Sequence, residues 1–130
     1  MIVLDASAAI EWLLQTSVGR QIENRIYARD ESLHAPHLLD LEVAQVLRRL
    51  VRQNEISTHR AEQAIDDLLD LRIHRYSQTV FLPRIWRLRS NLSAYDAAYV
   101  SLAESLSATL LTRDTRIAAF SGHSAAIEVF

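Results

Sequence analysis

Short apolar runs alternate with helical patterns along the whole 130-residue chain, and this alternation limits the possible folds more than any other feature. The first run, Ile2-Val3-Leu4, is followed by Asp5 and then by a helical pattern, as expected of a buried strand that leads into a helix. Strands connected through helices form a parallel sheet that is covered on both faces. We therefore predict an α/β fold, a three-layer α/β/α sandwich with a central parallel sheet, in a single domain over residues 1–130.

The remaining elements follow from the period of the apolar residues. We expect further strands at residues 32–35, where Pro36 ends the run, and at residues 72–76, 109–112 and 126–130. Helices are expected from Ser7, over residues 18–27, from Leu38 through Leu50, from a cap at Ser57 or Thr58 through Leu69, and over residues 80–89, 94–106 and 114–120. In such a fold, ligands bind beyond the carboxyl ends of the strands.

Composition excludes several kinds of site and of protein. The chain has no Cys, which excludes disulfides, thiolate catalysis and Cys-ligated zinc. It has no Lys either, which excludes a Schiff-base lysine and the lysine of a Walker motif. No apolar run approaches the length of a membrane span and the N-terminus has no basic leader, so we expect a cytoplasmic protein without a membrane partner.

The charge is distributed unevenly along the chain. Fourteen Arg and sixteen acidic residues give a net charge of −2. Residues 48–89 nevertheless hold nine Arg against five acids, which leaves five Arg against eleven acids elsewhere. Because Arg grips phosphate through two parallel hydrogen bonds, the basic region is suited to nucleic-acid binding.

Four acidic residues lie at or near the starts of helices, where Asp5 and Asp114 also follow strands. Each has an ordinary alternative explanation. Asp5 and Asp114 would serve as N-caps, and Asp96 would complete a capping box that begins at Ser93. Glu42, in the first turns of its helix, would be a solvated residue favoured by the helix dipole.

Taken together, the same four acids indicate a metal site. Asp5 and Asp114 project from one edge of the sheet, and Glu42 borders the buried face of its helix. Clustered carboxylates repel one another unless cations neutralise them, and oxygen ligands favour Mg²⁺ or Mn²⁺. Such a site suits hydrolysis of phosphodiester bonds by metal-activated water. Ser7 and Thr112 would orient the carboxylates or a bound water from a second shell, with capping and strand-end hydrogen bonding as the alternative.

The residues around these acids resemble the PIN-domain ribonucleases, in particular the VapC toxins of VapBC toxin–antitoxin pairs. Four stretches carry the resemblance, in the order and at the spacing of that family. They are Ile2-Val3-Leu4-Asp5-Ala6-Ser7-Ala8, Ala35-Pro36-His37-Leu38-Leu39-Asp40-Leu41-Glu42-Val43, Leu92-Ser93-Ala94-Tyr95-Asp96-Ala97-Ala98-Tyr99-Val100-Ser101-Leu102-Ala103-Glu104 and Leu110-Leu111-Thr112-Arg113-Asp114.

The resemblance implies an Mg²⁺- or Mn²⁺-dependent endoribonuclease whose catalytic and metal-binding residues are Asp5, Glu42, Asp96 and Asp114. Asp5 and Asp96 would be the firmest ligands, while Glu42 and Asp114 would act partly through water. Arg116 stands where some relatives carry a fifth acid. The resemblance also implies an RNA substrate, a cognate VapB-type antitoxin, a homodimer, and a heterotetramer or larger assembly with the antitoxin. The alternatives are a PIN fold that binds RNA or antitoxin without turnover, and a flap-endonuclease-type DNA nuclease, for which the chain is small.

Three arginines, Arg48, Arg49 and Arg52, follow Glu42 on the same expected helix. At about 100° per residue, Arg49 lies about 20° around the helix from Glu42. The arginines would hold RNA phosphates beside the acids, with a solvated helix flank as the alternative. Trp86 lies in a second basic stretch, and we expect it to pack in the core rather than to stack on bases. The five histidines have no paired ligand spacing, and no metal is assigned to them.

Overall fold

The computed structural model describes residues 1–130 and contains one five-stranded sheet in which all neighbouring strands are parallel. The strand order is β3-β2-β1-β4-β5. The strands are β1 (Ile2–Leu4), β2 (Leu33–Pro36), β3 (Ile73–Tyr76), β4 (Thr109–Thr112) and β5 (Ala126–Val129). The first strand of the chain is thus the central one, and its three residues are fully buried, as the continuous apolar run predicts.

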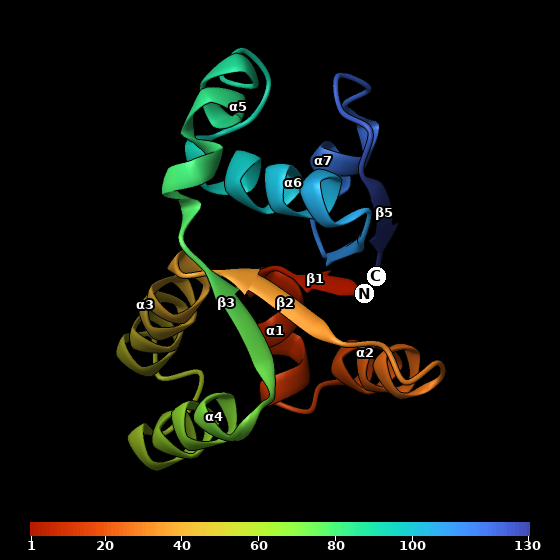
Figure 1. The fold of residues 1–130 in the computed structure, drawn as a ribbon. Helices are drawn as coiled ribbons and strands as arrows, with labels where there is room; N and C mark the ends of the chain where they lie inside the picture. The colour runs from red at the N-terminus through yellow and green to blue at the C-terminus, as the bar shows by residue number, and fades with distance from the viewer.

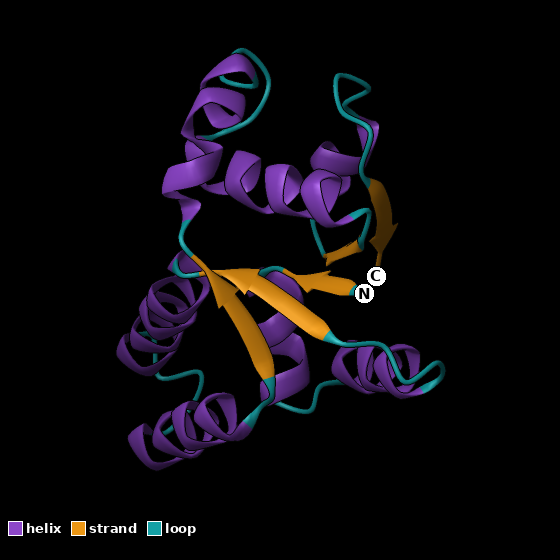
Figure 2. Cartoon of the chain, viewed as in Figure 1, coloured by secondary structure: helices purple, strands orange, loops and turns teal.

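Helices cover both faces of this sheet (Figure 1). One outer layer holds α1 (Ala6–Leu13), α2 (Ser17–Tyr27), α3 (Leu38–Arg52) and α4 (Thr58–Asp70). The other holds α5 (Leu82–Arg87), α6 (Ala94–Leu106) and α7 (Thr115–Ala119), and the 3₁₀ helix η1 (Gln78–Phe81) precedes α5. Figure 2 shows the helices above and below the strands, so the predicted three-layer α/β/α sandwich is confirmed. None of the helices is both long and apolar enough to cross a membrane.

The core joins these layers in one cluster of 31 buried apolar residues. Helix α6 is the most buried helix, with every residue from Ala97 through Ala103 buried, because it packs on β1, β2 and β4. Helices α1 and α2 approach closely at Gly19, where a Cβ atom would lie 1.9 Å from the carbonyl oxygen of Glu11. A side chain at this position is therefore incompatible with the observed packing.

The register of the central strands brings two helix starts together. Leu4 of β1 pairs with Leu111 of β4, so the residues that follow, Asp5 and Thr112, are neighbours at the carboxyl edge of the sheet. The chain continues from β1 toward β2 on one side, whereas β4 and β5 lie on the other. The gap between β1 and β4 is therefore the switch point where open α/β sheets bind ligands.

Three sequence-based expectations differ from the structure. Strand β2 includes Pro36 instead of ending before it; β1 pairs with β2 only as far as His34, so the missing N–H of Pro36 breaks no bond to β1. The helix expected over residues 80–89 is divided, because Pro83 starts a new helix, α5. Trp86 is not in the core: Ile85 of α5 and Leu88, which follows the helix, are buried instead, and 67% of Trp86 is exposed.

Candidate active site

An open pocket of about 560 Å³ lies at the switch point and is lined by all four predicted acids. The acids come from separate elements: Asp5 precedes α1, Glu42 lies on α3, Asp96 begins α6 and Asp114 precedes α7. Other polar residues of the lining are Ser7, Glu11, Arg49, Tyr99, Arg113 and Arg116. The fold thus brings together in one pocket four carboxylates that are spread along the sequence from Asp5 to Asp114.

Asp5 is the most deeply buried of the four acids, with 5% of its surface exposed. Its Oδ1 accepts hydrogen bonds from the Ser7 hydroxyl at 2.6 Å and from the Ala8 backbone N–H at 2.9 Å, which makes it the N-cap of α1. Burial raises the pKa of Asp5, the hydrogen bonds of Ser7, Thr112 and Ala8 oppose this, and the charge of Asp96 raises it further. Asp5 is therefore the N-cap that the sequence offered as one explanation, and it also lies in the pocket where the metal site is predicted.

Glu42 is half-buried on the side of α3 that borders the core. The buried Tyr99 of α6 donates a hydrogen bond of 2.7 Å to its Oε1. Burial raises the pKa of Glu42, the Tyr99 hydrogen bond opposes it, and the charges of Asp96 and Asp5 raise it further. The pKa of Tyr99 is raised far above its usual value by burial and by the carboxylate of Glu42, so the phenol remains a donor.

Asp96 lies in the first turn of α6, where its backbone N–H donates to the Ser93 hydroxyl at 3.1 Å. Burial raises the pKa of Asp96, the Ser93 hydrogen bond opposes it, the charge of Asp114 raises it, and the charge of Arg116 lowers it. The predicted cap at Ser93 is thus present. Asp96 is left as a half-buried carboxylate that faces other acids.

Asp114 differs from the other three acids because an arginine neutralises it. It caps α7 by accepting from the backbone N–H of Arg116 at 2.9 Å. The guanidinium of Arg116 also donates from Nε to Oδ1 at 3.0 Å and from Nη2 to Oδ2 at 2.6 Å. These hydrogen bonds hold the pKa of Asp114 below its usual value. Of the four predicted acids, three therefore have a raised pKa and the fourth is paired with an arginine.

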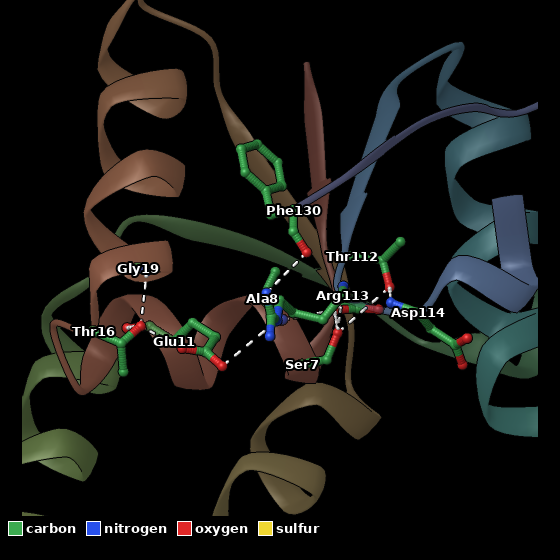
Figure 3. A network of polar contacts seen from close by, with 10 residues as sticks. Ser7, Ala8, Glu11, Thr16, Gly19, Thr112, Arg113, Asp114 and Phe130 are labelled. Carbon is green, nitrogen blue, oxygen red and sulfur yellow. Dashed lines mark hydrogen bonds and ion pairs between the residues drawn. The ribbon is translucent and has the colours of Figure 1, made fainter.

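The hydroxyls of Ser7 and Thr112 link the two strand ends, as Figure 3 shows. Their oxygens lie 3.4 Å apart. Ser7 Oγ accepts from the backbone N–H of Arg113 at 2.9 Å, and Thr112 Oγ1 accepts from that of Asp114 at 3.0 Å. Ser7 thus both orients Asp5 and fixes the turn after β4. The hydrogen bonding at strand ends that was the alternative explanation of Ser7 and Thr112 is therefore also present.

The chemistry of the donor set fits a hard divalent cation. The four carboxylates supply only oxygen, and burial and mutual repulsion raise the pKa of three of them, which a cation would counteract. In the conformation described, however, no three His, Asp or Glu side chains are arranged as a ready metal-binding group. The four acids therefore have the oxygen ligands and the shared pocket that a divalent cation needs. In this conformation Ser7 holds Asp5, Tyr99 holds Glu42 and Arg116 holds Asp114.

The structure separates the three arginines that follow Glu42. Arg49 lines the acidic pocket, as its angular position beside Glu42 indicates. Arg48 and Arg52 line a different groove of about 540 Å³ between α3 and α4, with apolar residues such as Leu47. Only Arg49 of this set is thus placed beside the acids.

Sequence reasoning did not assign a role to three further pocket residues. Tyr99 follows Asp96 by three positions on α6, and this spacing, which places both on one helix face, was the available signal. Arg113 Nε lies 3.6 Å from Glu11 Oε1, and Arg113 Nη1 donates a hydrogen bond of 2.9 Å to the Phe130 carbonyl oxygen (Figure 3). From the sequence, Arg116 is only the residue that stands where some relatives carry an acid. Its ion pair with Asp114 has no signature in the sequence.

Comparison with known proteins agrees with this geometry. The family model described as "PIN domain" matches residues 2–122. Ribonuclease VapC9 of Mycobacterium tuberculosis is 43% identical over 117 residues, which cover 90% of this chain and 88% of the relative. Ribonuclease VapC12 of the same organism is 41% identical over 129 residues, with coverage of 99% and 98%.

The fold is also shared with a solved toxin–antitoxin complex. The crystal structure of VapBC2 from Rickettsia felis, bound to a DNA fragment from its promoter, contains a chain that matches with a TM-score of 0.71 and 13% sequence identity. The match covers 99% of this chain and 98% of that one. Sequence and fold lead to the same result: the chain belongs to the PIN-domain family, on the branch of the VapC ribonucleases.

Proposed function

We propose that this protein is a metal-dependent endoribonuclease that hydrolyses RNA phosphodiester bonds in the acidic pocket, as the toxin of a type II toxin–antitoxin module. The observation that carries the proposal is the meeting of Asp5, Glu42, Asp96 and Asp114 in one open pocket at the switch point of the sheet. Relatives with 41% and 43% identity that bear the name ribonuclease support the RNA substrate.

The proposed cofactor is Mg²⁺ or Mn²⁺, which carboxylates of the acidic pocket would hold. A divalent cation supplies Lewis acidity at such a site: it lowers the pKa of water and stabilises negative charge on phosphate oxygens. The protein supplies the positions of the ligands. Ser7 and Ala8 hold the Asp5 carboxylate, and Tyr99 holds that of Glu42.

RNA would approach the pocket along its arginines. Arg49 lines the pocket beside the acids without an ion-pair partner, and its guanidinium group would hold a phosphate beside the scissile bond. In the proposed hydrolysis, water adds in line to phosphorus and the bond to the 3′-oxygen breaks. The products are a 3′-hydroxyl and a 5′-phosphate.

The proposed partner is a VapB-type antitoxin that inhibits the ribonuclease. Its support is the VapC identity of the relatives, since antitoxin and toxin occur together in the VapBC2 complex that shares the fold. We propose a homodimer that assembles with the antitoxin into a heterotetramer or larger complex. The proposed compartment is the cytoplasm, where a toxin would meet its RNA.

Mapping of cleavage sites on total RNA tests the proposed activity. Purified protein is incubated with RNA and Mg²⁺ or Mn²⁺, and the new 5′ ends are sequenced. We expect discrete sites that disappear with EDTA and with Asp5→Asn. Cleavage that survives both would overturn the proposed mechanism. Binding of RNA without any cleavage at all would favour the alternative, a PIN fold that binds RNA or antitoxin without turnover.

A further inference from the structure

The ion pair between Arg116 and Asp114 is the only ion pair that involves any of the four predicted acids, whereas Glu11, a fifth acid of the pocket lining, pairs with Arg113 at 3.6 Å. The guanidinium engages both oxygens of the carboxylate, and the backbone N–H of the same residue adds a third bond. The Arg116 side chain is otherwise 84% exposed, so Asp114 is the group that holds it in place. A cation that bound Asp114 would therefore have to compete with two charge-assisted hydrogen bonds from this guanidinium.

The other three acids have no such partner. Asp5 accepts from a hydroxyl and a backbone N–H, and Glu42 accepts from a phenol. These donors orient a carboxylate without cancelling its charge. Of the four predicted acids, three therefore still need a counter-charge, whereas Asp114 already has one.

We propose that Arg116 acts as a built-in counter-cation of Asp114, so that the pocket takes one divalent cation at Asp5, Glu42 and Asp96 and excludes a second from Asp114. A second ion at Asp114 would have to displace the guanidinium from both oxygens and would be repelled by its positive charge. Three carboxylates and one divalent cation leave a net charge of −1, so no further cation is needed there. This inference rests on the proposed metal dependence and specifies its stoichiometry.

Binding of Mn²⁺ to the RNA-free protein tests the inference without any activity assay. Calorimetry and the electron paramagnetic resonance signal of free Mn²⁺ give the number of bound ions for the wild type, Arg116→Ala and Arg116→Lys. We expect one ion in the wild type, and a second ion in Arg116→Ala that binds about tenfold more tightly than any second ion of the wild type. Arg116→Lys keeps the charge and should remain close to the wild type.

Arg49→Ala is the matched control, because it removes one arginine from the same pocket and Arg49 forms no ion pair with an acid. It should bind one ion. A second ion in Arg49→Ala would show a general effect of charge and would overturn the specific role of Arg116. Circular dichroism would verify that each variant is folded, as expected for exposed positions.

The remaining outcomes separate this inference from the proposed function. Two ions of similar affinity in a wild type that cleaves RNA would overturn the single-ion site and leave the ribonuclease proposal intact. A wild type that binds no Mn²⁺ would overturn both. Equal stoichiometry in wild type and Arg116→Ala, with one ion in each, would overturn the role of Arg116 alone.

Discussion

The hydroxyl of Tyr99 on α6 donates a 2.7 Å hydrogen bond to Oε1 of Glu42 on α3, 57 positions away in sequence. These helices belong to opposite outer layers of the sandwich, so the bond crosses the carboxyl edge of the sheet (Figure 1). Tyr99 is almost fully buried, with 2% of its surface exposed, and its hydroxyl thus fixes the direction of a pocket carboxylate from within the core.

Tyr99→Phe removes this hydrogen bond while it retains the aromatic packing. We expect kcat/KM for RNA cleavage to fall about tenfold or more, since groups that orient metal ligands typically contribute this much. The free energy of unfolding should fall by about 1 kcal/mol. Tyr95→Phe is the control, because Tyr95 is an exposed neighbour on the same helix. Equal activity of Tyr99→Phe and the wild type would contradict an orienting role.

Asp5→Asn should abolish cleavage and yet stabilise the metal-free protein. Burial raises the pKa of Asp5, so ionisation of this carboxyl costs more free energy in the folded state than in the unfolded chain. An amide oxygen can still accept from Ser7 and Ala8. We expect the free energy of unfolding at pH 7 in EDTA to rise by about 1 kcal/mol.

The pH dependence of unfolding verifies the sign of the stability change that we predict for Asp5→Asn. An acid whose pKa is raised on folding destabilises the folded state as pH rises through the interval between the two pKa values. The advantage of Asp5→Asn should therefore shrink when denaturation is repeated at acidic pH, where the wild-type carboxyl is protonated. A variant less stable than the wild type at pH 7 would contradict the predicted cost of the buried charge.

The burial of His34 predicts that protonation of this side chain destabilises the folded protein on mild acidification. It is buried, its Nδ1 lies 2.8 Å from the Tyr76 hydroxyl and its Nε2 lies 2.8 Å from Ser32 Oγ. Burial, with the charge of His74, lowers its pKa. A histidine whose pKa is lowered on folding contributes stability above its unfolded pKa and loses it as pH falls toward the folded value.

We therefore expect His34 to lower the free energy of unfolding by about 1 kcal/mol between neutral pH and about pH 5, measured as the difference between the wild type and His34→Gln. Chemical denaturation at a series of pH values measures this slope. His34→Gln should flatten it, whereas His59→Gln should not, because His59 is exposed on α4. An unchanged slope in His34→Gln would assign the pH dependence to other groups.

Gly19→Ala tests the close packing of α1 and α2. Its Cβ would lie 1.9 Å from a backbone oxygen of Glu11, so the helices must separate. We expect a loss of about 3 kcal/mol or more in the free energy of unfolding. Gly122→Ala is the matched control: there the new Cβ meets the ring of Phe120, an outer side chain that can rotate away. Similar melting temperatures for the two variants would contradict the predicted difference.

Much of the framework is encoded locally and was predictable from the sequence. Helix α6 begins and ends where the cap at Ser93 and the apolar pattern place it, and β4 matches its apolar run residue for residue. The division at Pro83 was less apparent, because the apolar pattern continues through it. The exposure of Trp86 depends on which face of a six-residue helix meets the core, and spacing does not determine this for so short a segment.

The candidate active site, too, was predictable from the sequence only in part. The places of Asp5 and Asp114 follow from the ends of parallel strands, and that of Glu42 from its helical angle. The partners of these acids do not follow, because Tyr99 reaches Glu42 only through the packing of two layers. The pairing of Asp114 with Arg116 is a choice of side-chain conformation at an exposed position, which no periodicity records.

The central place of β1 has a consequence for the timing of synthesis. Its partner β4 lies more than a hundred positions later, and Asp114 comes two residues after the end of β4. A chain still emerging from the ribosome contains Asp5 from the start, but the pocket has no second wall until β4 has been translated and paired. On the proposed function, a partly made chain would thus lack ribonuclease activity, and premature termination before residue 109 would yield an inactive fragment.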